Sequence, residues 1–174
     1  MNKRATGYIV GLALMGVASS AFADWQFDNG VAIVAPTANN STMELLAIAC
    51  GDPYQVEVYS RGGPVRPEEA SAEVDYFYKP GKVESQIDGA VFRLAASGSD
   101  AAVVLFAQGG AADNYLAPID ALFIEALKAG STLTLAFDVT PDANTQDGSA
   151  HETVAQFSLA GARAALEEAL APCR

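Results

Sequence analysis

The segment STLTLAFDV, residues 131–139, alternates along its length between large apolar side chains and smaller or polar ones. One set contains Leu133, Leu135, Phe137 and Val139, and the other contains Thr132, Thr134, Ala136 and Asp138. A period of two is typical of a β-strand that buries one of its faces. The segment therefore predicts a strand, and related patterns recur through the chain.

Further segments have strand character and are separated by turn-rich spacers. They are residues 31–35, Met43–Cys50, 55–60, 72–78, 90–96, 101–107 and 153–159. About eight short strands in one domain predict a mainly β protein of the α+β type, built as an antiparallel β-sandwich or a flattened barrel.

The segment Met43–Cys50 is apolar at almost every position, so both faces of its strand present apolar side chains. A strand of this kind is expected to lie centrally in a sheet and to be covered on both sides. The residues Gly51, Asp52 and Pro53 form a turn that leads directly to the next strand. This order of turn and strand indicates a hairpin.

Two segments have helical periodicity instead. In the first, Pro118 suits the opening helical position and Gly130 supplies a stop. Its apolar residues recur at helical spacing at Ile119, Leu122, Phe123, Ala126 and Leu127. In the second, residues 161–170, Arg163 and Glu167 form an exposed i,i+4 pair. Its apolar stripe consists of Ala162, Ala165, Leu166, Ala169 and Leu170.

Residues 1–23 have the features of a cleavable export signal. Lys3 and Arg4 form a basic start, residues 8–17 are apolar, and residues 21–23 form a small-x-small cleavage site. The apolar run is short for a membrane anchor, and no later stretch is apolar enough to span a bilayer. We therefore expect residues 1–23 to be removed, and residues 24–174 to form a single β-rich domain in the periplasm or outside the cell, with no membrane insertion.

The chain without this leader has eight basic and 21 acidic residues, a formal charge of −13. Such a surface repels phosphate backbones and anionic lipid headgroups, which argues against nucleic acid and membrane surfaces as partners. The simplest interpretation of this charge is that it keeps the protein soluble and has no other role. The sequence leaves the oligomeric state open.

The chain has only two cysteines, Cys50 and Cys173. In an oxidising compartment these two residues predict one intramolecular disulfide. Two free thiols, one of them reactive, are the alternative, but Cys173 has no neighbouring His or Lys to lower its pKa. Cys173 lies three helical turns after Ala162, so its thiol starts on the buried side of the helix and the bond would hold the helix on the sheet.

No catalytic constellation or zinc site emerges. His151 is the only histidine, it lies in a polar loop, and the chain has no Gly-x-Ser-x-Gly turn. We therefore expect a solvated loop histidine. One His and two paired Cys cannot fill a zinc shell. No cofactor is predicted, and the Gly109-Gly110 pair is expected to connect two elements.

Oxygen-rich and acidic segments are also weak candidates for a site. Residues 142–152 resemble a calcium loop through Asp142, Asn144, Asp147, Gly148 and Glu152. Their spacing departs from that of an EF-hand, so an ordinary polar loop is favoured over a calcium site. The carboxylate pairs at residues 68–69 and 167–168 are sequence neighbours, which is ordinary for surface charge, whereas glycosidase chemistry needs carboxylates that face each other across a cleft.

Aromatic residues provide a candidate partner surface in the first half of the chain. Tyr59 and Arg61 fall on the polar face of their strand, and Tyr76 and Tyr78 follow in the next aromatic cluster. Tyrosine and arginine are frequent in the hot spots of protein interfaces. The alternative is that Tyr76 and Tyr78 line the core with their hydroxyls at its rim.

The carboxy-terminal third carries a characteristic run of small and apolar residues. The run consists of Ile119-x-x-Leu122, Leu127-x-x-Gly130-x-x-Leu133-x-Leu135-x-Phe137, Phe157-Ser158-Leu159-x-Gly161 and Ala164-Ala165-Leu166. It resembles the end of the invasion-associated locus B family of small exported proteobacterial proteins. The resemblance implies an exported β-rich domain with a role at the cell envelope or in host contact, and it supplies no catalytic residues.

These features favour a noncatalytic periplasmic binding or accessory protein of the cell envelope, which would bind another envelope or periplasmic protein. The acidic charge keeps open a second class, an inhibitor of a basic hydrolase such as lysozyme. A third class is a hydrolase that depends on surface carboxylates.

Overall fold

The computed structural model describes residues 24–67, 77–99, 101–139 and 151–173. The strands are β1 (Gln26–Asp28), β2 (Val31–Val34), β3 (Ala38–Asn39), β4 (Met43–Cys50), β5 (Tyr54–Ser60), β6 (Val83–Ile87), β7 (Ala90–Gly98), β8 (Ala102–Gln108), β9 (Leu116–Ala117), β10 (Thr132–Phe137) and β11 (Thr153–Ser158). The helices are α1 (Ala121–Ala129) and α2 (Ala162–Ala169), with short 3-10 helices η2 (Ala111–Asp113) and η4 (Ala171–Cys173).

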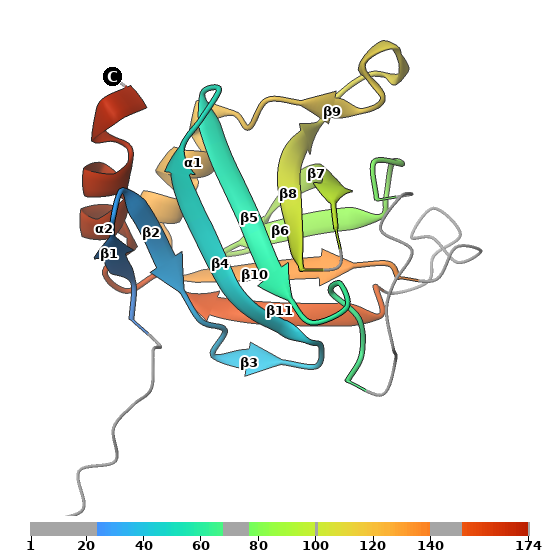
Figure 1. Ribbon diagram of the computed structural model, residues 1–174, viewed down its shortest axis with the longest axis horizontal. Coiled ribbons are helices and arrows are strands. Elements are labelled where there is room, and N and C mark those ends of the chain that lie inside the picture. The colour runs from blue at the N-terminus through green and yellow to red at the C-terminus, as the bar shows by residue number, and fades with distance from the viewer. Residues whose placement is uncertain (1–23, 68–76, 100, 140–150, 174) are drawn as a thin grey trace, which may run out of the picture.

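Over the described residues, all strands pair antiparallel in one 11-stranded sheet that does not close into a barrel. Figure 1 shows the sheet. The order across the sheet is β1-β2-β4-β5-β8-β7-β6-β10-β11-β3, and β9 pairs with β8. The predicted mainly β antiparallel class with two short helices is confirmed. The strand number is higher than the expected eight.

The sheet curls over on itself because of the path of β3. This strand lies between β2 and β4 in the chain, yet it pairs with β11 at the far end of the sheet. The backbone N–H of Thr37 extends this pairing by donating to the Gln156 carbonyl at 2.7 Å. Figure 1 shows the result, with β4 and β5 crossing in front of β10 and β11. Their inner side chains meet in one buried hydrophobic cluster.

Two tight hairpin turns set the register at separate places in the sheet. Asn29 and Gly30 join β1 to β2, and Asp88 and Gly89 join β6 to β7, all four with positive φ. Such two-residue turns match the twist of the strands they connect. The Asp88 carboxylate also accepts two backbone hydrogen bonds, from the N–H groups of residues 131 and 132, and so ties this turn to the start of β10.

Helix α1 begins later than its sequence pattern predicts. Asp120, and not Pro118, marks the start, because the Asp120 carboxylate accepts a hydrogen bond from the Leu122 N–H at 2.7 Å and caps the helix. Leu122 is 71% exposed, although it belongs to the apolar residues that recur at helical spacing. Ile124 is buried in its stead, alongside Phe123 and Leu127.

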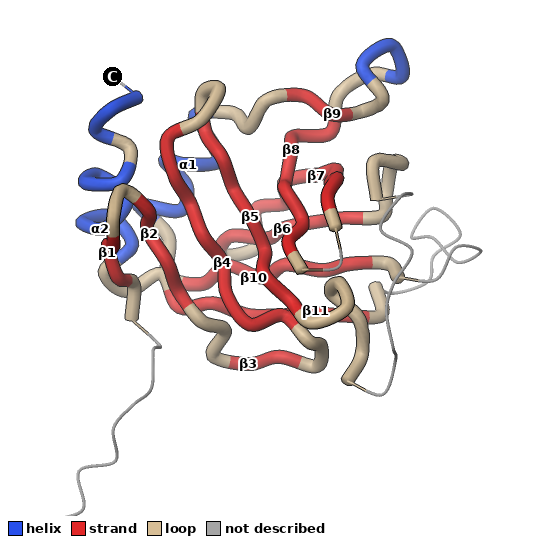
Figure 2. The backbone as a smooth tube through the Cα atoms, viewed as in Figure 1, coloured by secondary structure: helices blue, strands red, loops and turns tan. Residues whose placement is uncertain are grey.

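Helix α2 matches its predicted stripe. The side chains of this stripe are buried, including the following Leu170, and the helix contacts β1, β2, β4 and α1. Arg163 and Glu167 face solvent and form the predicted i,i+4 pair at 3.9 Å. Figure 2 shows the two helices gathered at one side of a molecule made mostly of strands.

Most expected strands are present with ends shifted by one or two residues, and β4 has the predicted bounds. The strand expected at residues 72–78 lies mostly outside the described residues, and its last two residues, Phe77 and Tyr78, form part of a turn. Strands β1, β3, β6 and β9 were not predicted. Within the described ranges, no helix has the length and apolar character needed to cross a membrane.

Candidate functional site

Strands β2, β4, β5 and β8 turn one row of side chains away from the core. Ile33 is the register partner of Ala47. Ala47 is also the partner of Glu57, whose partner on β8 is Val104. Most of the row is apolar and half-exposed, as in Val31, Ile33, Leu45, Ala49, Ala102, Val104 and Phe106. We call this row, together with Glu57 and Tyr59, the open face.

The open face corrects one expectation for β4. Its inner side chains Leu46 and Ile48 are buried in the core, as predicted for a strand near the middle of a sheet. Of its outer residues, Ala47 is buried but Leu45 and Ala49 are only half-buried, so over the described residues the second side is only partly covered. Figure 1 shows β4 and β5 toward the viewer with no helix in front of them.

A shallow groove of about 360 Å³ lies in the open face. Val31, Ala47 and Ala49 form its apolar part, while Gln55, Glu57 and Tyr59 from β5 form its polar side. Small alanine side chains on the middle strand explain the depression, because they leave room that larger residues would fill.

The polar side of the groove is organised around the Glu57 carboxylate. Gln55 donates to one oxygen of Glu57, and the Tyr59 hydroxyl donates to the other at 2.6 Å. The pKa of Tyr59 is raised chiefly by this hydrogen bond, because losing the proton would place a phenolate next to a carboxylate. Tyr59 therefore stays a hydrogen-bond donor, and its ring, which is 40% exposed, is fixed at the edge of the groove.

The residues of the predicted partner surface do not form one surface. Tyr59 is exposed on β5, and Arg61 lies just beyond the strand, where its Nε atom pairs with Glu44 at 2.6 Å. Tyr78 is half-buried in the turn before β6, and strands β8 and β7 lie between β5 and β6. Tyr76 lies outside the described residues.

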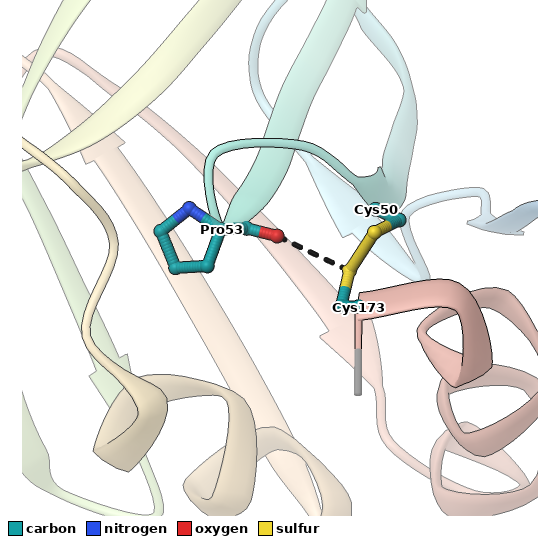
Figure 3. The surroundings of a disulfide bond; sticks show 3 residues. All are labelled: Cys50, Pro53 and Cys173. Carbon is teal, nitrogen blue, oxygen red and sulfur yellow. Dashed lines mark hydrogen bonds between the residues drawn. A yellow bond between two sulfur atoms is a disulfide. The ribbon is translucent and has the colours of Figure 1, made fainter.

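The predicted disulfide is present. Cys50 at the end of β4 is bonded to Cys173 of η4, with the two Cα atoms 5.5 Å apart (Figure 3). The Cys173 sulfur also lies 3.2 Å from the Pro53 carbonyl oxygen. A disulfide sulfur carries no proton, so this is a close sulfur–oxygen contact. The bond attaches the segment after α2 to the β4–β5 turn.

A buried ion pair was not predicted from the sequence. Lys82 Nζ lies 2.9 Å from Asp138 Oδ2, and the two side chains are 4% and 1% exposed. The backbone reinforces the contact, because the Asp138 N–H donates to the Lys82 carbonyl at 2.9 Å. The pair joins the segment before β6 to the end of β10. Its depth indicates a structural role.

The only histidine was expected to be solvated, but it is partly buried. His151 is half-buried just before β11, and burial lowers its pKa. The carboxylates of Glu84, Asp138 and Glu152 and a hydrogen bond with the Gly81 backbone oppose the shift but do not cancel it. His151 is therefore neutral at pH 7.

The described residues give no structural support for the calcium site or for the carboxylate pairs. Residues 142–148 lie outside the described residues, and Glu152 instead accepts a hydrogen bond from the Val139 N–H at 2.7 Å. Across the described ranges, no three His, Cys, Asp or Glu side chains gather as a metal site would require. Residues 68–69 are outside the described residues, and Glu167 and Glu168 are exposed on α2. Gly109 and Gly110 connect β8 to η2, as expected.

Comparison with known proteins adds one weak similarity. No family model matches the sequence, and no curated protein matches it. The structure is similar to a crystal structure of invasion associated protein B from Bartonella henselae, with a TM-score of 0.44 and 15% sequence identity. The alignment covers 85% of this chain and 96% of that one. That protein bears the name of the family that the carboxy-terminal residues resemble.

Proposed function

We propose that this protein is a noncatalytic binding or accessory protein of the cell envelope and that it holds a partner protein against its open face. The observation that carries the proposal is the half-exposed apolar surface of β2, β4 and β8 on either side of the polar residues of β5. Contiguous apolar surface of this kind on a folded protein marks an interaction site more often than scattered apolar residues do. The export signal expected at residues 1–23 supports the location.

The groove also indicates the chemistry of the partner. Its wall is apolar at Val31, Ala47 and Ala49, and its one charged side chain is Glu57. A complementary protein surface presents an aliphatic side chain to the alanines and a basic side chain to Glu57. The acidic charge of the whole chain would speed the approach of such a basic partner.

Site-specific crosslinking can test this assignment. We would place a photo-crosslinking residue at Gln55 on the rim of the groove, crosslink in periplasmic extract, and identify the captured protein by mass spectrometry. The captured protein would then be purified and its affinity measured with three variants. Ala49→Arg fills the groove, Glu57→Lys reverses its charge, and Gln86→Arg, on the exposed outer side of β6, is the matched control.

We expect Ala49→Arg and Glu57→Lys each to weaken binding at least about tenfold, and the control to leave it unchanged. The proposal is refuted if Ala49→Arg binds as well as the natural protein, or if the control loses as much affinity. Turnover of a cell-wall or peptide substrate by the purified protein would refute the noncatalytic assignment.

The formal charge of −13 for residues 24–174 favours a second function, inhibition of a basic hydrolase such as lysozyme. A long-range electrostatic complex of this kind weakens steeply as salt is added. We would measure lysozyme activity against increasing amounts of the protein at low and high salt. Inhibition lost at high salt and with Glu57→Lys would support this function, and full lysozyme activity at low salt would exclude it.

A further inference from the structure

A second, polar pocket lies on another part of the sheet and shares no residue with the groove. It has a volume of about 340 Å³ and lies beside the entry into β6. Its polar lining comes from Glu84 of β6, Arg93 of β7, Gln108 of β8 and His151. The strand register places Glu84 directly opposite Arg93. Leu94 pairs with Ala107, so Gln108 comes next to Arg93 on the third strand.

The Arg93 guanidinium has no ion-pair partner within the described residues of this acidic protein. Four other basic side chains are held in ion pairs, namely Arg61, Lys82, Lys128 and Arg163. Arg93 makes no ion pair or side-chain hydrogen bond within the described part of the chain, although Glu84 is its register partner. The Glu84 carboxylate accepts instead from Gln86, at 3.1 Å. The cation and the anion thus line one pocket without neutralising each other.

Two further polar side chains line the pocket. His151 Nε2 is buried and has no hydrogen-bond partner among the described residues. The Gln108 side chain makes no hydrogen bond within the described ranges. Burial lowers the pKa of His151, so at neutral pH the imidazole is uncharged and adds no second cation to the wall. Among the described residues, the pocket therefore presents one positive and one negative side chain, with a net charge of zero.

We propose that this pocket binds a small zwitterion of the chemical class of a free amino acid. Arg93 would hold the ligand carboxylate, because a guanidinium matches a carboxylate with two parallel hydrogen bonds. Glu84 would accept from the ligand ammonium, and the Gln108 amide would bond either end. A ligand with a single charge leaves one of the two side chains without a partner, so the pocket favours the zwitterion over a simple anion or cation. The volume suits a molecule of this size.

The test is a titration of the full folded protein followed by NMR chemical shifts. The zwitterions are L-alanine, L-serine, L-glutamate and L-lysine, and the half-ligands are L-alaninamide, which lacks the carboxylate, and propionate, which lacks the ammonium. We expect at least one zwitterion to saturate the protein at millimolar concentration with shifts centred on Glu84, Arg93 and Gln108. Each half-ligand should bind at least about tenfold more weakly than L-alanine. If another of the zwitterions saturates the protein instead, each half-ligand should bind at least about tenfold more weakly than that zwitterion.

Charge-removing variants connect binding to each side chain. Arg93→Gln should weaken binding of the zwitterion at least about tenfold and leave the affinity for L-alaninamide, the half-ligand with the ammonium, unchanged. Glu84→Gln should leave the affinity for propionate unchanged. Arg163→Gln on α2 is the matched control and should bind as the natural protein does. Both pocket residues are on the surface of the sheet, and an unchanged melting temperature would show that the variants are folded.

Three outcomes would overturn the inference. The first is the absence of saturation by any of the four zwitterions. The second is a half-ligand that binds as tightly as the corresponding zwitterion, which would assign the pocket to a simple ion. The third is an equal loss of affinity in Arg163→Gln. None of these outcomes bears on the open face, whose test uses other residues and another assay.

Discussion

Removal of the Cys50–Cys173 disulfide gives the most direct test of what stabilises this fold. The perturbation is the double substitution Cys50→Ser and Cys173→Ser, which keeps the side-chain size nearly constant. The two residues are 123 positions apart in the sequence. In the chain-entropy model, a crosslink that closes a loop of this length restricts the unfolded chain by about 5 kcal/mol. Measured values are commonly smaller, so we expect the free energy of unfolding to fall by about 2–5 kcal/mol.

Urea unfolding followed by tryptophan fluorescence is the assay, since Trp25 is the only tryptophan and is 8% exposed. Its indole N–H donates to the Ser158 carbonyl at 2.8 Å, so the signal reports on contact between the beginning of the chain and β11. The natural protein measured under reducing conditions is the control and should match the double variant. A loss below about 1 kcal/mol, with an unchanged denaturant slope, would refute the reasoning.

Three further predictions address the core and its charges. Lys82→Met should lower the free energy of unfolding by about 3–5 kcal/mol because it leaves Asp138 buried without its cation, and Lys82→Met with Asp138→Leu should recover most of the loss in urea unfolding. Leu166→Ala, at the fully buried centre of α2, should cost about 2–5 kcal/mol, and a smaller loss would mean that α2 is loosely docked. Because the pKa of His151 is lowered in the folded protein, the unfolded chain binds more protons below pH 6.5, and stability falls as the pH drops from 6.5 toward the folded pKa. Unfolding curves measured above and below pH 6.5 should show a smaller fall for His151→Gln than for the natural protein. An identical pH dependence of the two proteins would contradict this prediction.

The sequence was most informative where one local rule determines the structure. Met43–Cys50 has the predicted bounds because a run of apolar side chains followed by Gly51 and Pro53 permits little besides a strand and a turn. The stripe of α2 is equally local, since its apolar residues, apart from the exposed Ala164, lie on one helical face. The cysteine pair follows from their number and from the expected compartment.

The missed strands had a signal that could have located two of them. The Asn29-Gly30 and Asp88-Gly89 pairs are typical of two-residue hairpins, and each joins a missed strand to a predicted one. Strand β6 reads as polar because Ser85 occupies an inward position between Glu84 and Gln86. The two-residue strand β3 depends on its partner β11, and no local pattern can show such a pairing.

The buried ion pair, the groove and the polar pocket depend on contacts between residues far apart in the sequence, and no local pattern shows such contacts. Lys82 and Asp138 are 56 positions apart, and each looks like an ordinary surface charge in its own segment. Tyr59 was correctly placed on an exposed face, but the charge of Arg61 is paired with Glu44 of the neighbouring strand. The polar pocket brings together residues from three strands and from the segment before β11, so only the sheet order reveals it.

The detour of β3 has a consequence for the time course of folding. Residues 38–39 pair with residues 155–156, which are synthesised only after the intervening 40–154. The sheet therefore cannot be completed until this whole segment has been made, and contacts of such large sequence separation make folding slow. A nascent or truncated chain that ends before β11 would leave β3 without its pairing strand and part of the apolar core exposed, which makes such a chain prone to aggregation.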